Sequence, residues 1–256
     1  MRSRLSLVLV VGLAVGLLSS CGGKPDVLTE KTLFSEVAAA QAKAETSHVA
    51  MSLTVPAGQS FRSYGEMKIG KSAKDTAMAM TVTGNTGGIG KVELRLVNQN
   101  FYIALGTLTS NKFVKIDLTD KSNPIAMQYG EIIENLDPAR QVKQYEAAIV
   151  KFDNEGKPVK LDGVQAQPYK ITIDPAKARQ LKNMGAGKLP KTMDFTLFVG
   201  PDDLPRRMVS LIPAPDGSGT TKLQMDYTAW GEKVSIAAPG AKNITKDSLL
   251  SQLTGQ

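Results

Sequence analysis

Val49-Ala50-Met51-Ser52-Leu53-Thr54-Val55 alternates large apolar side chains with small or polar ones. Successive side chains of a β-strand point to opposite faces, so this period of two predicts a strand with one apolar face. Pro56-Ala57-Gly58 follows directly and is typical of a turn. The stretch therefore predicts the first strand of a sheet that is buried on one face and wet on the other.

The same alternation recurs along the chain after this first strand. Strands are predicted next at residues 61–69, 75–83, 91–97, 101–105 and 112–117. In the second half they are predicted at residues 148–153, 157–161, 164–174, 193–199, 208–212, 221–227 and 233–237. Short strands joined by tight turns favour an antiparallel meander.

Helical spacing interrupts the strand pattern at a few places. Residues 32–46 place apolar side chains at helical intervals in an alanine-rich stretch, and further helices are predicted at 123–136, 137–144 and 175–183. Composition does not shift between the two strand-rich halves. We therefore expect an α+β fold, a single curled antiparallel sheet or half-barrel, with helices covering its concave face and leaving an apolar cavity.

The N-terminus carries a secretion signal that ends in Leu18-Ser19-Ser20-Cys21. Arg2 and Arg4 precede an apolar run over residues 5–18, which is shorter than the roughly 20 residues of a membrane span. Cys21 is the only cysteine of the chain. Two small residues before this cysteine indicate a lipobox. The alternative is a chance cysteine in a simple signal peptide.

Three regions follow from this interpretation. Residues 1–20 are predicted to be a lipoprotein signal peptide, residues 21–31 a flexible tether, and residues 32–256 a single lipid-binding domain. The mature chain would begin at Cys21 and be lipid-anchored to the outer face of the cell membrane. A single cysteine allows no disulfide within the chain, so we expect packing alone to hold the fold.

Charge and composition exclude some function classes. Loss of Arg2 and Arg4 with the signal lowers the formal net charge from +7 to +5. Nucleic acid is a poor candidate partner, because the chain is expected to be exported and its basic clusters lack interleaved aromatic residues. Attraction to anionic lipid head groups and a merely solvated surface both remain open as explanations of the positive charge.

No catalytic motif stands out. The glycine-rich stretch from Gly84 to Lys91 lacks the spacing of a phosphate-binding loop, and His48 is the only histidine. The acid pairs Glu131/Glu134 and Asp202/Asp203 are interpreted as solvated carboxylates on a helix face and in a turn. We therefore expect no enzymatic activity, no cofactor and no metal site.

Methionine is frequent in the predicted strands. The chain has ten methionines, and seven of them lie in strand-like stretches. The flexible, polarisable thioether suits an adaptable apolar binding surface, although ordinary core filling explains it as well. Aromatic residues make up only 5% of the chain, which favours a cavity over an interior filled by rings.

Three segments carry a resemblance to a known family. They are residues 162–174 with Asp162-Gly163-Val164, residues 195–208 ending in Asp203-Leu204-Pro205-Arg206-Arg207-Met208, and residues 227–239 with Trp230-Gly231 and Ala238-Pro239. Together with the lipobox they resemble the LppX/LprA/LprF/LprG-type lipoproteins of mycobacteria and related actinobacteria. Lys233 stands where the family pattern has proline, and Phe198 where it has tryptophan.

The resemblance implies a half-open antiparallel barrel whose hydrophobic cavity holds acyl chains of a lipid or glycolipid in transit across the cell envelope. The family is not enzymatic, and its lipid-attachment cysteine corresponds to Cys21. Strand alternation then assigns one face to the cavity. These residues are Met51, Leu53, Met67, Met78, Met80, Leu94, Leu96, Phe101, Ile103, Phe195 and Leu197.

The expected partners are the membrane, reached through the anchor, a lipid or glycolipid ligand, and a membrane transporter. The chain is expected to be a monomer. The alternative is an anchored, non-enzymatic scaffold whose core is filled and which binds an envelope protein. A filled interior with only ordinary packing voids would favour this alternative.

Overall fold

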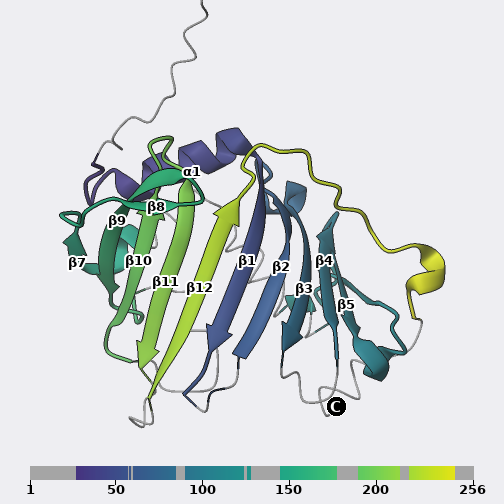
Figure 1. Cartoon of the computed structure of the whole chain (residues 1–256). Helices are drawn as coiled ribbons and strands as arrows, with labels where there is room; N and C mark the ends of the chain where they lie inside the picture. The colour runs from purple at the N-terminus through teal and green to yellow at the C-terminus, as the bar shows by residue number, and fades with distance from the viewer. Residues whose placement is uncertain are drawn as a thin grey trace, which may run out of the picture.

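A computed structural model shows an open antiparallel sheet with a helix across one end of its strands (Figure 1). It describes residues 27–56, 58, 60–84, 90–123, 126–127, 145–177, 190–213 and 219–245. The helix is α1 (Leu33–Ala44). The strands are β1 (Thr46–Thr54), β2 (Ser60–Lys68), β3 (Ala77–Gly84), β4 (Val92–Val97), β5 (Asn100–Leu105), β6 (Val114–Asp117), β7 (Ile149–Asp153), β8 (Val159–Leu161), β9 (Val164–Ile173), β10 (Met193–Val199), β11 (Pro205–Pro213) and β12 (Thr220–Thr228).

The 12-stranded sheet has the order β6-β5-β4-β3-β2-β1-β12-β11-β10-β9-β7, and β8 pairs with β9 beside this path. The meander predicted for the first half is confirmed, because β1 to β6 are neighbours in chain order. The first and last strands join the halves. His48 of β1 lies opposite Thr228 of β12, and the ladder continues to Thr54 opposite Lys222. Both halves of the sequence therefore contribute to one sheet.

Helix α1 is attached to the sheet by its first two turns. Leu33, Phe34 and Val37 are buried and follow helical spacing, so one stripe of the helix faces inward. They pack against side chains of β9 and β10, including Tyr169 and Leu197. The helix thus covers the β9–β10 end of the sheet. Glu45 then takes a positive φ of 63° and ends the helix one residue before β1.

The predicted strand at Lys233–Ala237 is wrong. Residues 229–240 have no ladder partner and run across the ends of β1 to β4 (Figure 1). Side chains hold this segment instead, since Glu66 accepts from the Ser235 amide at 3.2 Å and Arg95 donates to the Ala237 carbonyl at 3.0 Å. The alternation of residues 233–237 does not reveal whether the backbone of this segment bonds to side chains or to a neighbouring strand.

Most of the other predicted helices fall outside the described residues. Within the described part, residues 126–127 and 145–148 are helical, and residues 175–177 form a turn. Only α1 is therefore seen to pack on the sheet as a full helix among the residues that the structure describes. The curled open sheet fits the predicted half-barrel, whereas covering of its concave face by further helices stays a prediction.

Gly65 is required where β2 meets β3. An added Cβ at Gly65 would lie 1.9 Å from the Ala79 carbonyl oxygen and 2.7 Å from the Met80 sulfur. The thioether can move, but the carbonyl cannot move without separating the strands. We expect Gly65→Ala to lower the unfolding free energy by about 1–3 kcal/mol, measured by thermal or denaturant unfolding. Gly240→Ala is the matched control, because no atom lies within 4 Å of its added Cβ. Equal stability of the two variants would contradict this packing.

Candidate functional site

Strand register divides the sheet into an apolar face and a polar face. We define the apolar face as the one that carries Val49, Met51 and Leu53 of β1, because directly paired residues point to the same side of a sheet. Following the ladders outward gives its other members. They include Ser47, Phe61, Ser63, Gly65, Met67, Met78, Met80, Val82, Val92, Leu94, Leu96, Phe101, Ile103, Val114, Ile116, Leu223, Met225, Tyr227, Met208, Ser210, Phe195, Leu197, Tyr169 and Ile171.

The residues that sequence alternation assigned to a ligand cavity all lie on this face. They are Met51, Leu53, Met67, Met78, Met80, Leu94, Leu96, Phe101, Ile103, Phe195 and Leu197. Leu96, Phe101 and Leu197 are buried, and the others are half-buried. Their contact with a ligand stays a prediction.

Two packed clusters occupy the ends of the apolar face. At one end Tyr169, Ile171 and Leu197 pack under α1. At the other end Phe101 and Ile116 pack with Ala126. The middle of the face belongs to neither cluster and is rich in methionine. We call it the central methionine region, defined by Met51, Met67, Met78, Met80 and Met225.

Tyr227 brings a polar group to the apolar face beside this region. Its ring stacks on Trp230 with centroids 5.9 Å apart, and the Trp230 indole donates to the Pro205 carbonyl at 2.9 Å. The Tyr227 hydroxyl donates to the Met225 sulfur at 3.7 Å, a weak acceptor. Burial raises the pKa of the Tyr227 phenol well above its ordinary value, and the charges of Tyr145 and Asp226 raise it further.

The raised pKa of Tyr227 predicts a loss of stability in alkali. The unfolded phenol releases its proton near pH 10, whereas the folded phenol stays protonated, so the unfolded state then binds fewer protons. The unfolding free energy should therefore be unaffected by Tyr227 below about pH 10 and fall above it by about 1.4 kcal/mol per pH unit. Denaturant unfolding between pH 8 and pH 12 measures this slope. Tyr227→Phe should make it shallower, and the slope that remains includes the Tyr145 phenol, whose pKa burial also raises. An unchanged slope in Tyr227→Phe would refute the assignment.

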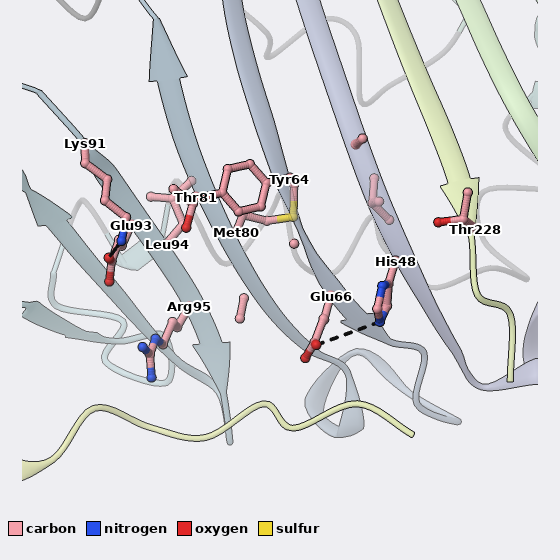
Figure 2. A pocket seen from close by; sticks show the side chains of 14 residues that line it. His48, Tyr64, Glu66, Met80, Thr81, Lys91, Glu93, Leu94, Arg95 and Thr228 are labelled. Carbon is pink, nitrogen blue, oxygen red and sulfur yellow. Dashed lines mark ion pairs between the residues drawn. The ribbon is translucent and has the colours of Figure 1, made fainter. Parts of the chain in front are cut away.

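The polar face carries a shallow depression of about 490 Å³ over β12 and β1 to β4 (Figure 2). Its floor is low because Ala50, Ala79 and Thr81 have small side chains at adjoining register positions. The Tyr64 side chain stands above this floor and is 56% exposed. The segment that contains Ser235 borders the depression, through its amide bond to Glu66.

Charged side chains around the depression are already partnered. Lys91 pairs with Glu93, which raises the pKa of the Lys91 ammonium chiefly through this hydrogen bond. His48 Nε2 lies 3.8 Å from a Glu66 oxygen (Figure 2). Arg95 lies over the Phe113 ring and also binds the C-terminal segment. The His48 side chain is 44% exposed.

The other groups considered for chemistry have structural roles or lie outside the described residues. The Asp202 carboxylate pairs with Arg206 and accepts from the Leu204 amide. Glu131 and Glu134 lie in residues that are not described. In the described part of the chain, no group of three or more histidine, cysteine, aspartate or glutamate side chains is placed to hold a metal ion. No helix formed by the described residues has the length and apolarity to span a membrane.

The open antiparallel sheet, with a helix packed at one end of its apolar face, defines a half-barrel fold that solved structures share. LprF from Mycobacterium bovis matches with a TM-score of 0.54 and 15% identity, over 86% of this chain and 100% of that one. Lipoprotein LppX from Mycobacterium tuberculosis matches with a TM-score of 0.53 and 14% identity, over 82% of this chain and 100% of that one. No protein-family model and no curated protein sequence matches. The resemblance expected from the sequence is therefore confirmed at the level of the fold.

Sequence reasoning missed the residues that β12 adds to the apolar face. Leu223, Met225 and Tyr227 lie directly opposite Leu53, Met51 and Val49. Alternation within 221–227 does mark them as one face of a strand. What was missing is the pairing of β12 with β1, which no local pattern specifies.

Proposed function

We propose that the chain is a cell-envelope lipoprotein that binds acyl chains of a lipid or glycolipid on its apolar face and carries them across the envelope. In this proposal Cys21, which lies outside the described residues, attaches the chain to the outer face of the cell membrane. The observation that carries the proposal is the central methionine region, an apolar, half-buried surface between two packed clusters. The fold shared with lipoprotein LppX supports it.

The size and chemistry of this region suit acyl chains. Strand β1 has nine residues, about 30 Å at 3.3 Å per residue. Acyl chains of one leaflet span about half of a ~30 Å hydrocarbon core, so a strand of this length can accommodate one. Each buried CH₂ contributes about 0.8 kcal/mol. Such a ligand therefore needs little polar recognition, in keeping with a face of methionine and aliphatic side chains.

Native mass spectrometry of residues 22–256, exported and purified from the envelope, tests lipid binding. We expect a mass increment that organic extraction resolves into a lipid with two or more acyl chains. A clean apo mass that also fails to take up added lipid would reject the carrier function.

A clean apo mass without lipid uptake would favour the second candidate function, an anchored scaffold that binds an envelope protein. One observation favours this second candidate, namely the polar-face depression with its exposed Tyr64 ring. Under this alternative, Tyr64→Ala would abolish capture of the protein partner and leave the lipid content unchanged.

The anchor has its own test. Cys21→Ser is expected to release the chain from the membrane fraction and to abolish incorporation of labelled palmitate, because serine has no thiol for acylation. Ser19→Ala is the matched control, since it keeps both the small residue and the cysteine. Membrane attachment that survives Cys21→Ser would show that another segment holds the chain on the membrane.

A further inference from the structure

Two serine hydroxyls on the apolar face are buried without a partner. Ser47 is 0% and Ser63 is 3% exposed, and neither Oγ has a hydrogen-bond partner among the described residues. Buried polar groups are nearly always hydrogen-bonded, because an unpaired one forfeits its bonds to water. An orphaned hydroxyl on a binding face therefore indicates a partner that the protein alone does not supply.

Ser63 lies in the central methionine region. It is directly opposite Met51 of β1 on one side and Val82 of β3 on the other. Gly65 follows on the same face, and the Met80 sulfur lies over it. The hydroxyl is thus covered by apolar side chains on the surface proposed for acyl chains, and a ligand reaches it only when a flexible neighbour such as the Met51 or Met80 thioether moves aside.

Other serines on the same face show that the position of Ser63 is distinctive. The Ser210 hydroxyl is also buried, but it donates to the Asp194 carbonyl at 3.2 Å. Ser47 lies near the start of β1, four residues and about 13 Å along the strand from Met51, the partner of Ser63. One ligand carbonyl cannot reach both orphaned hydroxyls. Ser47 borders the central methionine region opposite Met67, at the start of β1, whereas Ser63 lies inside the region, opposite Met51.

The surroundings define the chemistry of the missing partner. Among the described residues, β1 to β4 and β12 place no charged side chain on the apolar face. A carboxylate or phosphate would be buried there without a counter-charge, which is costly. A neutral carbonyl accepts a hydrogen bond from a hydroxyl without that cost, and each ester-linked acyl chain has one beside its hydrocarbon.

We propose that the Ser63 hydroxyl donates a hydrogen bond to the ester carbonyl of a bound acyl lipid. The inference rests on the proposed function and adds a specificity to it. The apolar face binds the hydrocarbon, and Ser63 selects lipids whose chains are ester-linked over those whose chains are ether-linked.

A competition experiment measures this selectivity directly. The mature full-length chain, delipidated in detergent, is incubated with equal amounts of dioleoylglycerol diester and its diether analogue, which has the same chains but no carbonyls. Native mass spectrometry then gives the ratio of the two bound masses. We expect the wild type to prefer the diester about tenfold, the order of one hydrogen bond in a dry site. Ser63→Ala should lower the ratio to about one while still binding the diether.

Ser210→Ala is the matched control, because it deletes a buried hydroxyl of the same face that already has a partner. It should keep the tenfold ratio. Ser63→Ala should also unfold at or above the wild-type temperature without lipid, since it removes an unpaired group. A lower unfolding temperature would mean that the hydroxyl bonds within the protein and would overturn the proposal.

The remaining outcomes separate the two proposals. Equal binding of diester and diether by the wild type, or a ratio that persists in Ser63→Ala, overturns the role of Ser63 and leaves acyl binding intact. Failure of the wild type to bind either lipid overturns acyl binding itself, and the role of Ser63 with it.

Discussion

Met51→Glu is expected to abolish lipid loading by weakening acyl-lipid binding about 100-fold, which corresponds to ~2.8 kcal/mol. Met51 lies in the middle of the apolar face, between Met225 of β12 and Ser63 of β2. A carboxylate there must either lose its hydration under the acyl chains or be protonated, and both oppose binding. Titration with a fluorescent acyl lipid, together with the mass of co-purified lipid, measures the effect.

Strand alternation supplies the control for this variant. Ser52 is the next residue of β1 and points to the polar face, between Gln224 and Arg62. Ser52→Glu introduces the same charge at nearly the same position along the strand, so it should keep the wild-type affinity. Equal loss of lipid in both variants would point to damage to β1 rather than to the apolar face. Undiminished loading in Met51→Glu would mean that the ligand does not lie on this face.

Leu33→Ala is expected to give the largest loss of stability, about 3 kcal/mol within the usual range of 2–5 kcal/mol for a buried leucine. Leu33 is 0% exposed and belongs to the cluster that joins α1 to β9 and β10. Its loss leaves a cavity under the first turn of the helix. At about 2–4 °C per kcal/mol for a domain of this size, the unfolding temperature should fall by about 6–12 °C.

Lys43→Ala controls for helix propensity, because Lys43 is exposed near the end of the same helix. It should change the unfolding temperature by little. Lipid binding gives a second measurement on Leu33→Ala. Since α1 covers only the β9–β10 end of the apolar face, the folded variant should still bind lipid at low temperature. A loss of both stability and binding would instead show that the docked helix shapes the binding surface.

Local sequence patterns determined most elements and the face to which their side chains belong. Alternation from Val49 to Val55 predicted β1, and the apolar stripe that begins at Leu33 predicted α1. Both follow from periods of 2 and 3.6, which depend only on neighbouring residues. For the same reason the eleven residues assigned to a cavity all lie on one face.

Only the tertiary structure decided which strands are neighbours. Alternation tells which way a side chain points but not which strand lies beside it, because ladder hydrogen bonds join backbone groups that every residue has. The pairing of β1 with β12 therefore brought Met225 and Tyr227 to the apolar face without a local signal. Likewise, the alternating segment after β12 is not held by a β-ladder. Hydrogen bonds join its backbone to the side chains of Glu66 and Arg95. The unpaired hydroxyl of Ser63 is also a feature that only the tertiary structure decides. Its burial and its lack of a partner depend on the side chains that distant segments place around it.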